Sequence, residues 1–240
     1  MKLVTFFSLK GGAGKTTGLM AATSGLRRRG LRVALLEGDK NDPLKFWREN
    51  AIDNGTWDDD CTIFEAATPK ELESAYAKAH GAGYDVALLD AEGGESDLNT
   101  NAIISSDLIV VPLSLSSFDI EYGIQSFQFA RQALEINDGA VDIAFLVCRF
   151  PASKDKLTRA DRESFDILKD LPQVATRLPL RAAYADMATS GMLHLYYEGL
   201  IGDPALRVTS FAIGTALKEA DGLATDITDA IHVEPAHADT

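Results

Sequence analysis

The sequence predicts an α/β fold, in which one doubly wound, mostly parallel sheet carries helices on both faces. Two observations support this prediction. Short runs of apolar and β-branched residues are nearly continuous, as in strands that are covered on both faces. These runs alternate with longer stretches of helical pattern, which is the order of repeated strand–helix–strand units.

Five segments have the composition of buried strands. Three of them contain the runs VALLE, VALLD and LIVVPL. A strand with one face in solvent would carry polar residues at alternate positions, and the interiors of these runs carry none. The predicted strands are Leu3–Ser8, Arg32–Glu37, Tyr84–Asp90, Leu108–Leu113 and Asp142–Arg149.

The segments between these strands carry helical patterns and helix-start signals. Thr68 is predicted to cap a helix that begins at Pro69, with Glu71 at the third position bonding back to the cap. Asp203 and Pro204 predict a further helix start of the same kind. The predicted helices between strands are Lys15–Arg29, Pro43–Asn54, Pro69–His80, Phe118–Ile136 and Thr158–Leu171.

Length and composition bound the class of protein. A chain of 240 residues, 46% hydrophobic and 25% charged, suits one globular domain, which we expect over residues 1–232, with a frayed tail over residues 233–240. No apolar run approaches the roughly 18 residues of a membrane helix, and the N-terminus lacks a signal-peptide pattern, so we expect a cytoplasmic protein. Cys61 and Cys148 lack metal-ligand spacing and are expected to be reduced and buried.

The stretch GGAGKTT, residues 11–17, follows the first predicted strand and opens the first predicted helix. In this context a glycine-rich turn predicts a phosphate-binding P-loop, because glycines let backbone N–H groups approach phosphate oxygens closely. The helix N-terminus adds its positive dipole end. The residues predicted to bind nucleotide are Lys10, Gly11, Gly12, Ala13, Gly14, Lys15, Thr16 and Thr17.

Within this stretch, Lys15 is expected to contact the β- and γ-phosphates, and the Thr16 hydroxyl is expected to bind Mg²⁺. The alternative is a flexible strand-to-helix turn with a surface lysine. Leu9 occupies the position of the first glycine in the usual P-loop pattern, and Lys10 precedes Gly11.

The pattern K-G-G-x-G-K-[ST] resembles the deviant Walker A motif of the ParA/MinD superfamily of ATPases. The resemblance implies ATP and Mg²⁺ as cofactors, weak ATPase activity and a homodimer that forms on ATP binding. It also implies that Lys10 reaches across the dimer and neutralises charge at the partner's nucleotide, as an arginine finger does. The alternative for Lys10 is an exposed turn lysine.

Two further strands end in carboxylates, as a magnesium–nucleotide site requires. In RVALLEGDKNDP, Asp39 matches the second aspartate of the superfamily's D-x-D motif, which implies that it orients or activates the attacking water. Glu37 replaces the first aspartate of that motif, and its role stays open. Asp42 is interpreted as the N-cap of the next helix rather than as a catalytic residue.

The later strand end in YDVALLDAEGG resembles the Walker B motif, which implies that Asp90 holds Mg²⁺ together with Thr16. The superfamily often continues with D-x-P-P, whereas this chain has Glu92, Gly93 and Gly94. The two glycines are expected to offer backbone N–H groups near the γ-phosphate. Glu92 is either a supporting carboxylate or a surface residue.

The resemblance touches most of residues 1–200, with gaps, and includes SDLIVVPLSLSSFDI and RLPLRAAYADMATSG. The superfamily often has asparagine near the end of the FLVCRF strand, where this chain has Cys148 and Arg149. These two residues are therefore the candidates for contact with the base. The preference for adenine follows from the resemblance alone.

The position of the P-loop near residue 10 is similar to that in short ParA proteins, without an N-terminal helix-turn-helix domain. The acidic segment LATDITDAIHVEPAHADT differs from the basic amphipathic helix of MinD-type proteins, so no membrane helix is expected. The run PLKFWRENA resembles the VirC-type ParA-like ATPases of T-DNA and conjugative transfer. The same run also suits an amphipathic helix that packs through Leu44 and Trp47.

The charge distribution bears on DNA binding. A formal net charge of −13 disfavours general attraction to nucleic acid, but residues 145–181 carry eight basic and five acidic side chains, against 15 and 31 elsewhere. The alternative is a set of solvated helix faces that their own acids neutralise. The candidates for contact with the DNA backbone are Arg149, Lys154, Lys156, Arg159, Arg177 and Arg181.

Together with the resemblance, these features predict an ATP-dependent dimerisation switch that binds DNA and a partner protein. The partner is expected to be a ParB-like protein or a relaxosome component, and the process plasmid partition or T-DNA transfer. The alternatives are a metabolic ATP-dependent ligase of the dethiobiotin-synthetase-like class and a nucleotide-binding adaptor without hydrolysis. The catalytic candidates are Lys10, Lys15 and Asp39.

Overall fold

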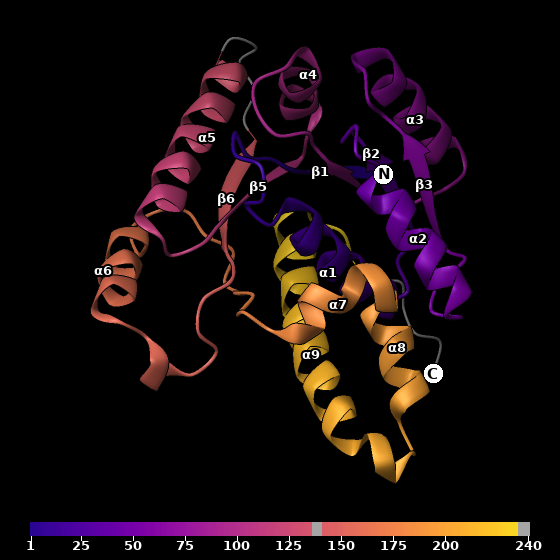
Figure 1. The fold of residues 1–240 in the computed structure, drawn as a ribbon. Helices are drawn as coiled ribbons and strands as arrows, with labels where there is room; N and C mark the ends of the chain where they lie inside the picture. Colours follow the sequence, from indigo (N-terminus) through magenta and orange to yellow (C-terminus); the bar gives the residue numbers. More distant parts are fainter. Residues whose placement is uncertain (136–140, 235–240) are drawn as a thin grey trace.

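A six-stranded sheet forms the centre of the computed structural model, which describes residues 1–135 and 141–234 (Figure 1). The strands pair in the order β3-β2-β4-β1-β5-β6, and every pairing is parallel. The predicted doubly wound parallel sheet is therefore confirmed. The strands are β1 (Lys2–Phe6), β2 (Val33–Glu37), β3 (Cys61–Glu65), β4 (Val86–Asp90), β5 (Leu108–Leu113) and β6 (Asp142–Val147).

Helices cover both faces of this sheet. Figure 1 shows α3, α4 and α5 on one side of the sheet and α1, α7, α8 and α9 on the other. The helices are α1 (Lys15–Arg28), α2 (Pro43–Asp53), α3 (Pro69–Gly81), α4 (Asp97–Ser105), α5 (Ser117–Glu135), α6 (Arg159–Leu168), α7 (Ala182–Ser190), α8 (Leu193–Leu200) and α9 (Arg207–Ala230), with short 3₁₀ turns η1 (Lys154–Lys156) and η2 (Pro204–Leu206).

The side chains of the nearly continuous apolar strands pack into hydrophobic cores on both faces of the sheet. On β1, Val4 packs into the core with α1 and α9, whereas Leu3 packs into the core with α3 and α4. On β5, Val110 faces the first core, and its neighbours Ile109 and Val111 face the core beneath α5. Because side chains alternate along a strand, both faces are filled, and the interior residues of β1, β2, β4 and β5 are all buried.

Local signals place several helix starts. The Thr68 hydroxyl accepts a hydrogen bond from the Glu71 N–H at 3.2 Å, so Thr68 caps α3 as predicted, whereas the described residues show no return bond from the Glu71 side chain. The Asp203 carboxylate accepts from the Ala205 N–H at 2.8 Å, which starts η2, and α9 follows directly. Ile136, the end of the predicted helix Phe118–Ile136, lies outside the described residues.

Among the strands and α-helices of the described residues, four have no counterpart in the prediction. Edge strand β3 has the sequence CTIFE, and only Cys61 of its residues is buried, so it lacks a continuous apolar run. Helices α4, α7 and α8 have nine, nine and eight residues, too few to display a clear 3.6-residue period. In the structure β3 pairs with β2, α4 packs against α3 and α5, α7 contacts α2, and α8 packs against α9.

The C-terminal end of the described chain packs on the core. Val233 contacts the α1–α9 core, and its N–H donates to the Thr228 carbonyl at 3.0 Å. The frayed tail expected over residues 233–240 falls mostly on residues 235–240, outside the described part, so the domain boundary stays a prediction. Within residues 1–135 and 141–234, no helix combines the length and apolar character needed to cross a membrane.

Candidate nucleotide-binding site

The segment between β1 and α1 has the backbone of a phosphate-binding loop. Gly12 and Gly14 have φ angles of 74° and 110°, which residues with a Cβ rarely adopt. A Cβ built at Gly11 or Gly12 would meet no atom within 4 Å, so the loop borders open space. Gly14 is the N-cap residue of α1 and supplies no side-chain cap, which leaves the first turn of α1 open to an anion.

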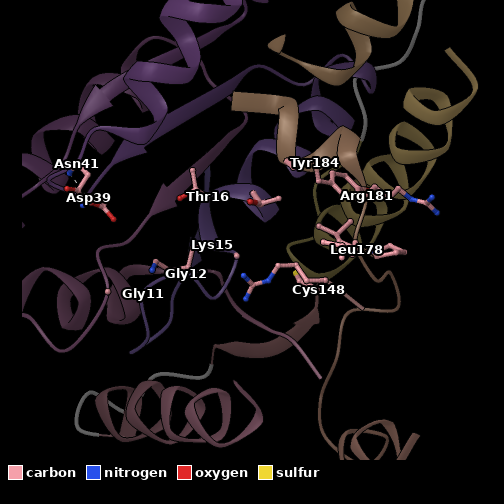
Figure 2. Close-up of a pocket in the computed structure, with 17 residues that line it drawn as sticks. Gly11, Gly12, Lys15, Thr16, Asp39, Asn41, Cys148, Leu178, Arg181 and Tyr184 are labelled. Atoms are coloured by element: carbon pink, nitrogen blue, oxygen red, sulfur yellow. Dashed lines mark hydrogen bonds between the residues drawn. The ribbon is translucent and has the colours of Figure 1, made fainter. Parts of the chain in front are cut away.

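This loop forms the middle of a cavity of about 470 Å³, which we call the P-loop cavity (Figure 2). Asp39 and Asn41, from the loop after β2, stand at one end. The other end is formed by Cys148, Arg149, residues 178–181, Tyr184 and Ala185. The volume is in the range of sites for small ligands and cofactors.

Lys15, the first residue of α1, is 7% exposed and lines this cavity. Burial lowers the pKa of its ammonium, and the negative charges of Asp90 and Asp39 partly offset that effect by raising it. The ammonium therefore gains stability from an added anion in the cavity, as a phosphate-binding lysine should.

Thr16 and Asp90 meet as the sequence predicts. The Thr16 hydroxyl donates to Asp90 Oδ2 at 2.6 Å, and Asp90 is fully buried. Burial raises the pKa of Asp90 to about 6, against the lowering effects of the Thr16 hydrogen bond and the Lys15 charge. Asp90 Oδ1 is buried and has no hydrogen-bond partner within the described part of the chain. A hydroxyl and a carboxylate oxygen at one point are ligands that suit Mg²⁺, so the donor set fits the metal.

Asp39 faces the cavity from a turn that fixes one of its oxygens. Asp39 Oδ1 accepts hydrogen bonds from the Asn41 N–H at 2.9 Å and from the Asn41 Nδ2 at 2.8 Å. The Asp39 carbonyl accepts from the Asp42 N–H at 3.1 Å, which closes the turn. The carboxylate is therefore held beside the P-loop by its own neighbours.

The N-terminus of α2 differs from the prediction. Asp42 occupies the N-cap position with a φ of 48°, but its side chain forms no capping hydrogen bond, so the interpretation of Asp42 as the cap is wrong. Glu37 Oε2 instead accepts from the N–H groups of Leu44 at 2.7 Å and Lys45 at 3.4 Å. The sequence could not show this, because the cap comes from the preceding strand.

Lys10 contacts its own chain. Its ammonium donates to Asp119 Oδ1, at the start of α5, and lies 5.9 Å from the centre of the Tyr122 ring. Asp119 is 8% exposed and also accepts from the Ser114 hydroxyl, and the Arg149 guanidinium lies 3.7 Å from its Oδ2. Burial raises the pKa of Asp119, but the hydrogen bonds from Lys10 and Ser114 outweigh it and lower the pKa overall.

The far end of the cavity contains the two base-contact candidates and residues that the sequence did not assign to it. Cys148 forms a β-bridge with Leu178, and Arg149 beside it has a φ of 53°. Arg181, predicted to contact DNA, lines this end and forms a two-oxygen ion pair with Glu219 of α9. Tyr184 of α7 also lines the cavity. A pairing between segments 38 residues apart leaves no local signal in the sequence.

The loop after β4 closes the P-loop from the side. A Cβ built at Gly93 would lie 3.4 Å from the Gly11 nitrogen, and Gly93 lines the cavity. The Gly94 N–H donates to the Ser8 carbonyl at 3.4 Å. The carboxylate of Glu92 pairs with Lys40 at 3.2 Å and so connects this loop to the Asp39 loop.

The other basic candidates lie outside the cavity. Lys156 is exposed in η1, and Arg159, exposed on α6, pairs with Glu163 at 2.7 Å. Arg177 is exposed and stacks over the Phe165 ring at 4.5 Å. The Lys154 side chain lies outside the described part of the structure. The predicted role of these residues in DNA contact stays a prediction.

Both cysteines are buried and free, as expected, and burial raises the pKa of the Cys148 thiol to about 12. Cys148 is therefore an apolar wall of the cavity at neutral pH.

Comparison with known proteins identifies the family. The sequence profile of the VirC1 protein family matches residues 1–233. The virC1 protein of Rhizobium rhizogenes is 39% identical over 219 residues, which cover 91% of this chain and 94% of that protein. The chain belongs to the VirC1 protein family. This agrees with the resemblance of PLKFWRENA to VirC-type proteins.

More distant relatives agree with the superfamily resemblance. A ParA protein of Rhizobium radiobacter is 30% identical over 138 residues, which cover 58% of this chain and 60% of that protein. The structure of the septum site-determining protein MinD of Pyrococcus horikoshii with Mg-ADP superposes on this chain with a TM-score of 0.63 at 17% sequence identity. The alignment covers 93% of this chain and 97% of the MinD chain. The chain of this VirC1 family member therefore has the fold of MinD- and ParA-like P-loop proteins.

The buried carboxyl of Glu37 predicts a pH dependence of stability. Burial raises its pKa from the ordinary 4.5 to about 7, despite hydrogen bonds from the Leu44 and Lys45 N–H groups, and the nearby Asp90 and Asp42 charges add to the rise. The folded state therefore holds this proton more tightly than the unfolded state. The stabilisation is complete below about pH 4.5 and is lost as the pH rises through 7.

Urea unfolding of nucleotide-free protein and of Glu37→Gln between pH 4 and 8 measures this effect. The stability of the natural protein should fall by about 3 kcal/mol relative to the variant over this range, since one pKa unit corresponds to about 1.4 kcal/mol. The desolvation of Asp90 is common to both proteins and cancels in the difference, whereas its repulsion of Glu37 is part of the measured effect. Parallel curves for the two proteins would contradict the prediction.

Proposed function

We propose that this protein is a Mg²⁺-dependent ATPase in which ATP binding brings two copies together, and that the dimer binds DNA and a partner complex. The observation that carries the proposal is the convergence of Lys15, the Thr16–Asp90 pair and Asp39 on one glycine-lined cavity. The similarity to VirC1, to ParA and to a Mg-ADP complex of MinD supports it. The VirC-type resemblance favours a role in T-DNA or conjugative transfer over plasmid partition.

Each group at the cavity has a part in this proposal. The P-loop N–H groups and Lys15 would bind the phosphates, and the end formed by Cys148 and Leu178 would hold the base. Thr16 and Asp90 would hold Mg²⁺, which when bound neutralises phosphate charge. Asp39, fixed by Asn41, would orient a water for attack on the γ-phosphorus and accept its proton.

The proposed dimer interface is the surface around Lys10. Phe118, next to Asp119, is 70% exposed, and Leu180 at the cavity rim is 67% exposed. Large exposed apolar side chains near a charged site suit a surface that a second copy covers. On dimerisation Lys10 would exchange Asp119 for the partner's nucleotide, where its charge would stabilise the transferring phosphoryl group.

DNA binding would use the outward basic side chains near η1 and α6. Lys156, Arg159 and Arg177 are exposed, whereas Arg181 is occupied by Glu219. With a net charge of −13, binding by one copy should be weak, and two such faces in a dimer would double the phosphate contacts.

Two substitutions separate binding from turnover. Lys15→Ala should weaken ATP binding by about 100-fold or more, because a charged hydrogen-bond donor to the phosphates is removed. Asp39→Ala should bind ATP with nearly natural affinity while turnover falls by about 100-fold, the usual effect of losing a general base. Fluorescent-nucleotide titration and phosphate release measure the two quantities. Natural ATP affinity in Lys15→Ala would count against the site, and turnover that needs an added carboxylate substrate would favour a ligase.

Mixing variants tests whether Lys10 acts across a dimer. The Lys10→Ala chain retains Asp39 in its own cavity, and the Asp39→Ala chain retains Lys10, which would reach the partner's cavity. In a mixed dimer the cavity of the Lys10→Ala chain therefore has both residues and is the one complete site. Each variant alone should be inactive, and an equal mixture should recover about a quarter of the natural activity for random pairing of a two-fold dimer. The control is each variant mixed with Lys15→Ala/Lys10→Ala protein, which lends no lysine. No recovery at concentrations where dimers form would contradict a role in trans.

Salt dependence tests the DNA contacts. Removing Lys156 and Arg159 together should weaken binding of the ATP-bound protein to duplex DNA of any sequence. The slope of log affinity against log salt should fall by about one for each phosphate that the variant no longer neutralises. Arg131→Ala is a matched control, because Arg131 is exposed on α5 and pairs with Glu135 as Arg159 pairs with Glu163. Equal effects of both changes would place the DNA surface elsewhere.

A further inference from the structure

The loop that carries Asp39 is closed by a side chain from the strand before it. Glu37 is the last residue of β2, directly before this loop. Its Oε2 accepts hydrogen bonds from the N–H groups of Leu44 at 2.7 Å and Lys45 at 3.4 Å, which lie after the loop. These donors belong to the first turn of α2, which has no local side-chain cap. A carboxylate at this position also complements the positive end of the helix dipole.

The base of the same loop is fixed against β4. The Gly38 N–H donates to the Asp90 carbonyl at 3.1 Å, and a Cβ at Gly38 would lie 2.9 Å from that oxygen. In the sheet, Glu37 stands opposite Asp90. The Asp39 loop is therefore held at its first residue by the strand that carries Asp90 and at its far end by Glu37.

Helix α2 is itself anchored away from the cavity. Leu44 and Trp47 are fully buried in the core with α1 and α9. The side chains of Asn50 and Asn54 donate to the carbonyls of Ala188 and Thr189 in α7, at 3.1 and 2.8 Å. Because α2 is fixed on both sides, the contact from Glu37 fixes the loop between them rather than moving the helix.

We propose that Glu37 is a positioning residue for hydrolysis: its carboxylate caps α2 and thereby holds the Asp39 loop against the P-loop cavity. The inference rests on the proposed ATPase function. It assigns Glu37 a role through backbone N–H groups and not through Mg²⁺ or the attacking water. The distinction is testable, because the two roles rank the substitutions in opposite orders.

Three substitutions at position 37 separate the roles. Glu37→Gln keeps the length and an acceptor oxygen for the Leu44 N–H but loses the charge. Glu37→Asp keeps the charge but is shorter by one carbon, about 1.5 Å, and should not reach that N–H. Glu37→Ala has neither. Asp42→Asn is the matched control, since Asp42 stands at the N-cap without capping and asparagine tolerates its positive φ.

For a positioning role, kcat should stay within about threefold of the natural value in Glu37→Gln and Asp42→Asn, and fall by at least about tenfold in Glu37→Asp and Glu37→Ala. KM for ATP should change by less than about threefold throughout, because the P-loop is untouched. A kcat that is kept in Glu37→Asp and lost in Glu37→Gln would overturn the proposal and assign the charge itself a role at the metal or the water.

Amide hydrogen exchange in the nucleotide-free proteins gives a reading that does not need activity. The N–H groups of Leu44 and Lys45 should exchange at least about tenfold faster in the alanine and aspartate variants and keep their protection in the glutamine variant, with strand amides unchanged. Unchanged protection at these two amides, or faster exchange across the whole sheet, would overturn the positioning role. If the natural protein hydrolyses no ATP, the proposed function fails, while the exchange comparison still decides whether Glu37 holds the loop.

Discussion

The parallel register of β1, β2 and β4 is the constraint on which the site depends. Phe6 of β1 and Glu37 of β2 both stand opposite Asp90 of β4, so the three strands end at one level of the sheet. The P-loop, the Asp39 loop and the Gly93 loop leave from these three ends. A slip of one residue in either pairing would displace one loop by about 3.3 Å and turn every apolar side chain of that strand to the other face. The cores on the two faces of the sheet therefore fix the geometry of the cavity, because they specify which side chains of each strand face which side.

The cavity concentrates charges of both signs in buried positions. Burial is the largest cause of the raised pKa values of Asp90 and Glu37 and of the lowered pKa of Lys15. A phosphate chain with Mg²⁺ would supply the opposite charge to Lys15 and to Asp90 at once. Ligand binding and folding stability should therefore be coupled, since any ligand that binds only the folded state shifts the unfolding equilibrium.

The Asp39 end of the cavity and the lysine that precedes the P-loop are both held by contacts with other helices. Helix α2 carries the capped end of the Asp39 loop and is bonded to α7, whose first turn includes the cavity residue Tyr184. Lys10 is bonded to Asp119 in α5, close to exposed Phe118. The loop that carries Asp39 is thus held at the start of α2, and Lys10 is held at the start of α5.

The sequence predicts features whose signal is local. Each of these signals spans only a few residues: glycines at the left-handed positions of the P-loop, a lysine and a threonine at a helix start, and an aspartate at the end of an apolar strand. The structure places Lys15, Thr16 and Asp39 around one cavity and Asp90 in contact with Thr16. Continuous apolar runs give the parallel sheet for the same reason, because burial on both faces leaves a pattern in each strand alone.

The sequence by itself therefore determined five of the six strands of the sheet, the phosphate loop and the family resemblance, since each depends on neighbouring residues and the backbone geometry they favour. The tertiary structure alone decided that Glu37 and not Asp42 caps α2, that Asp119 holds Lys10, and that Arg181 faces the cavity with Glu219 as its partner. In these cases the deciding contact joins side chains or N–H groups from different elements. Which of several competing donors and charges meets a given carboxylate is fixed only when the packed helices set the distances between them.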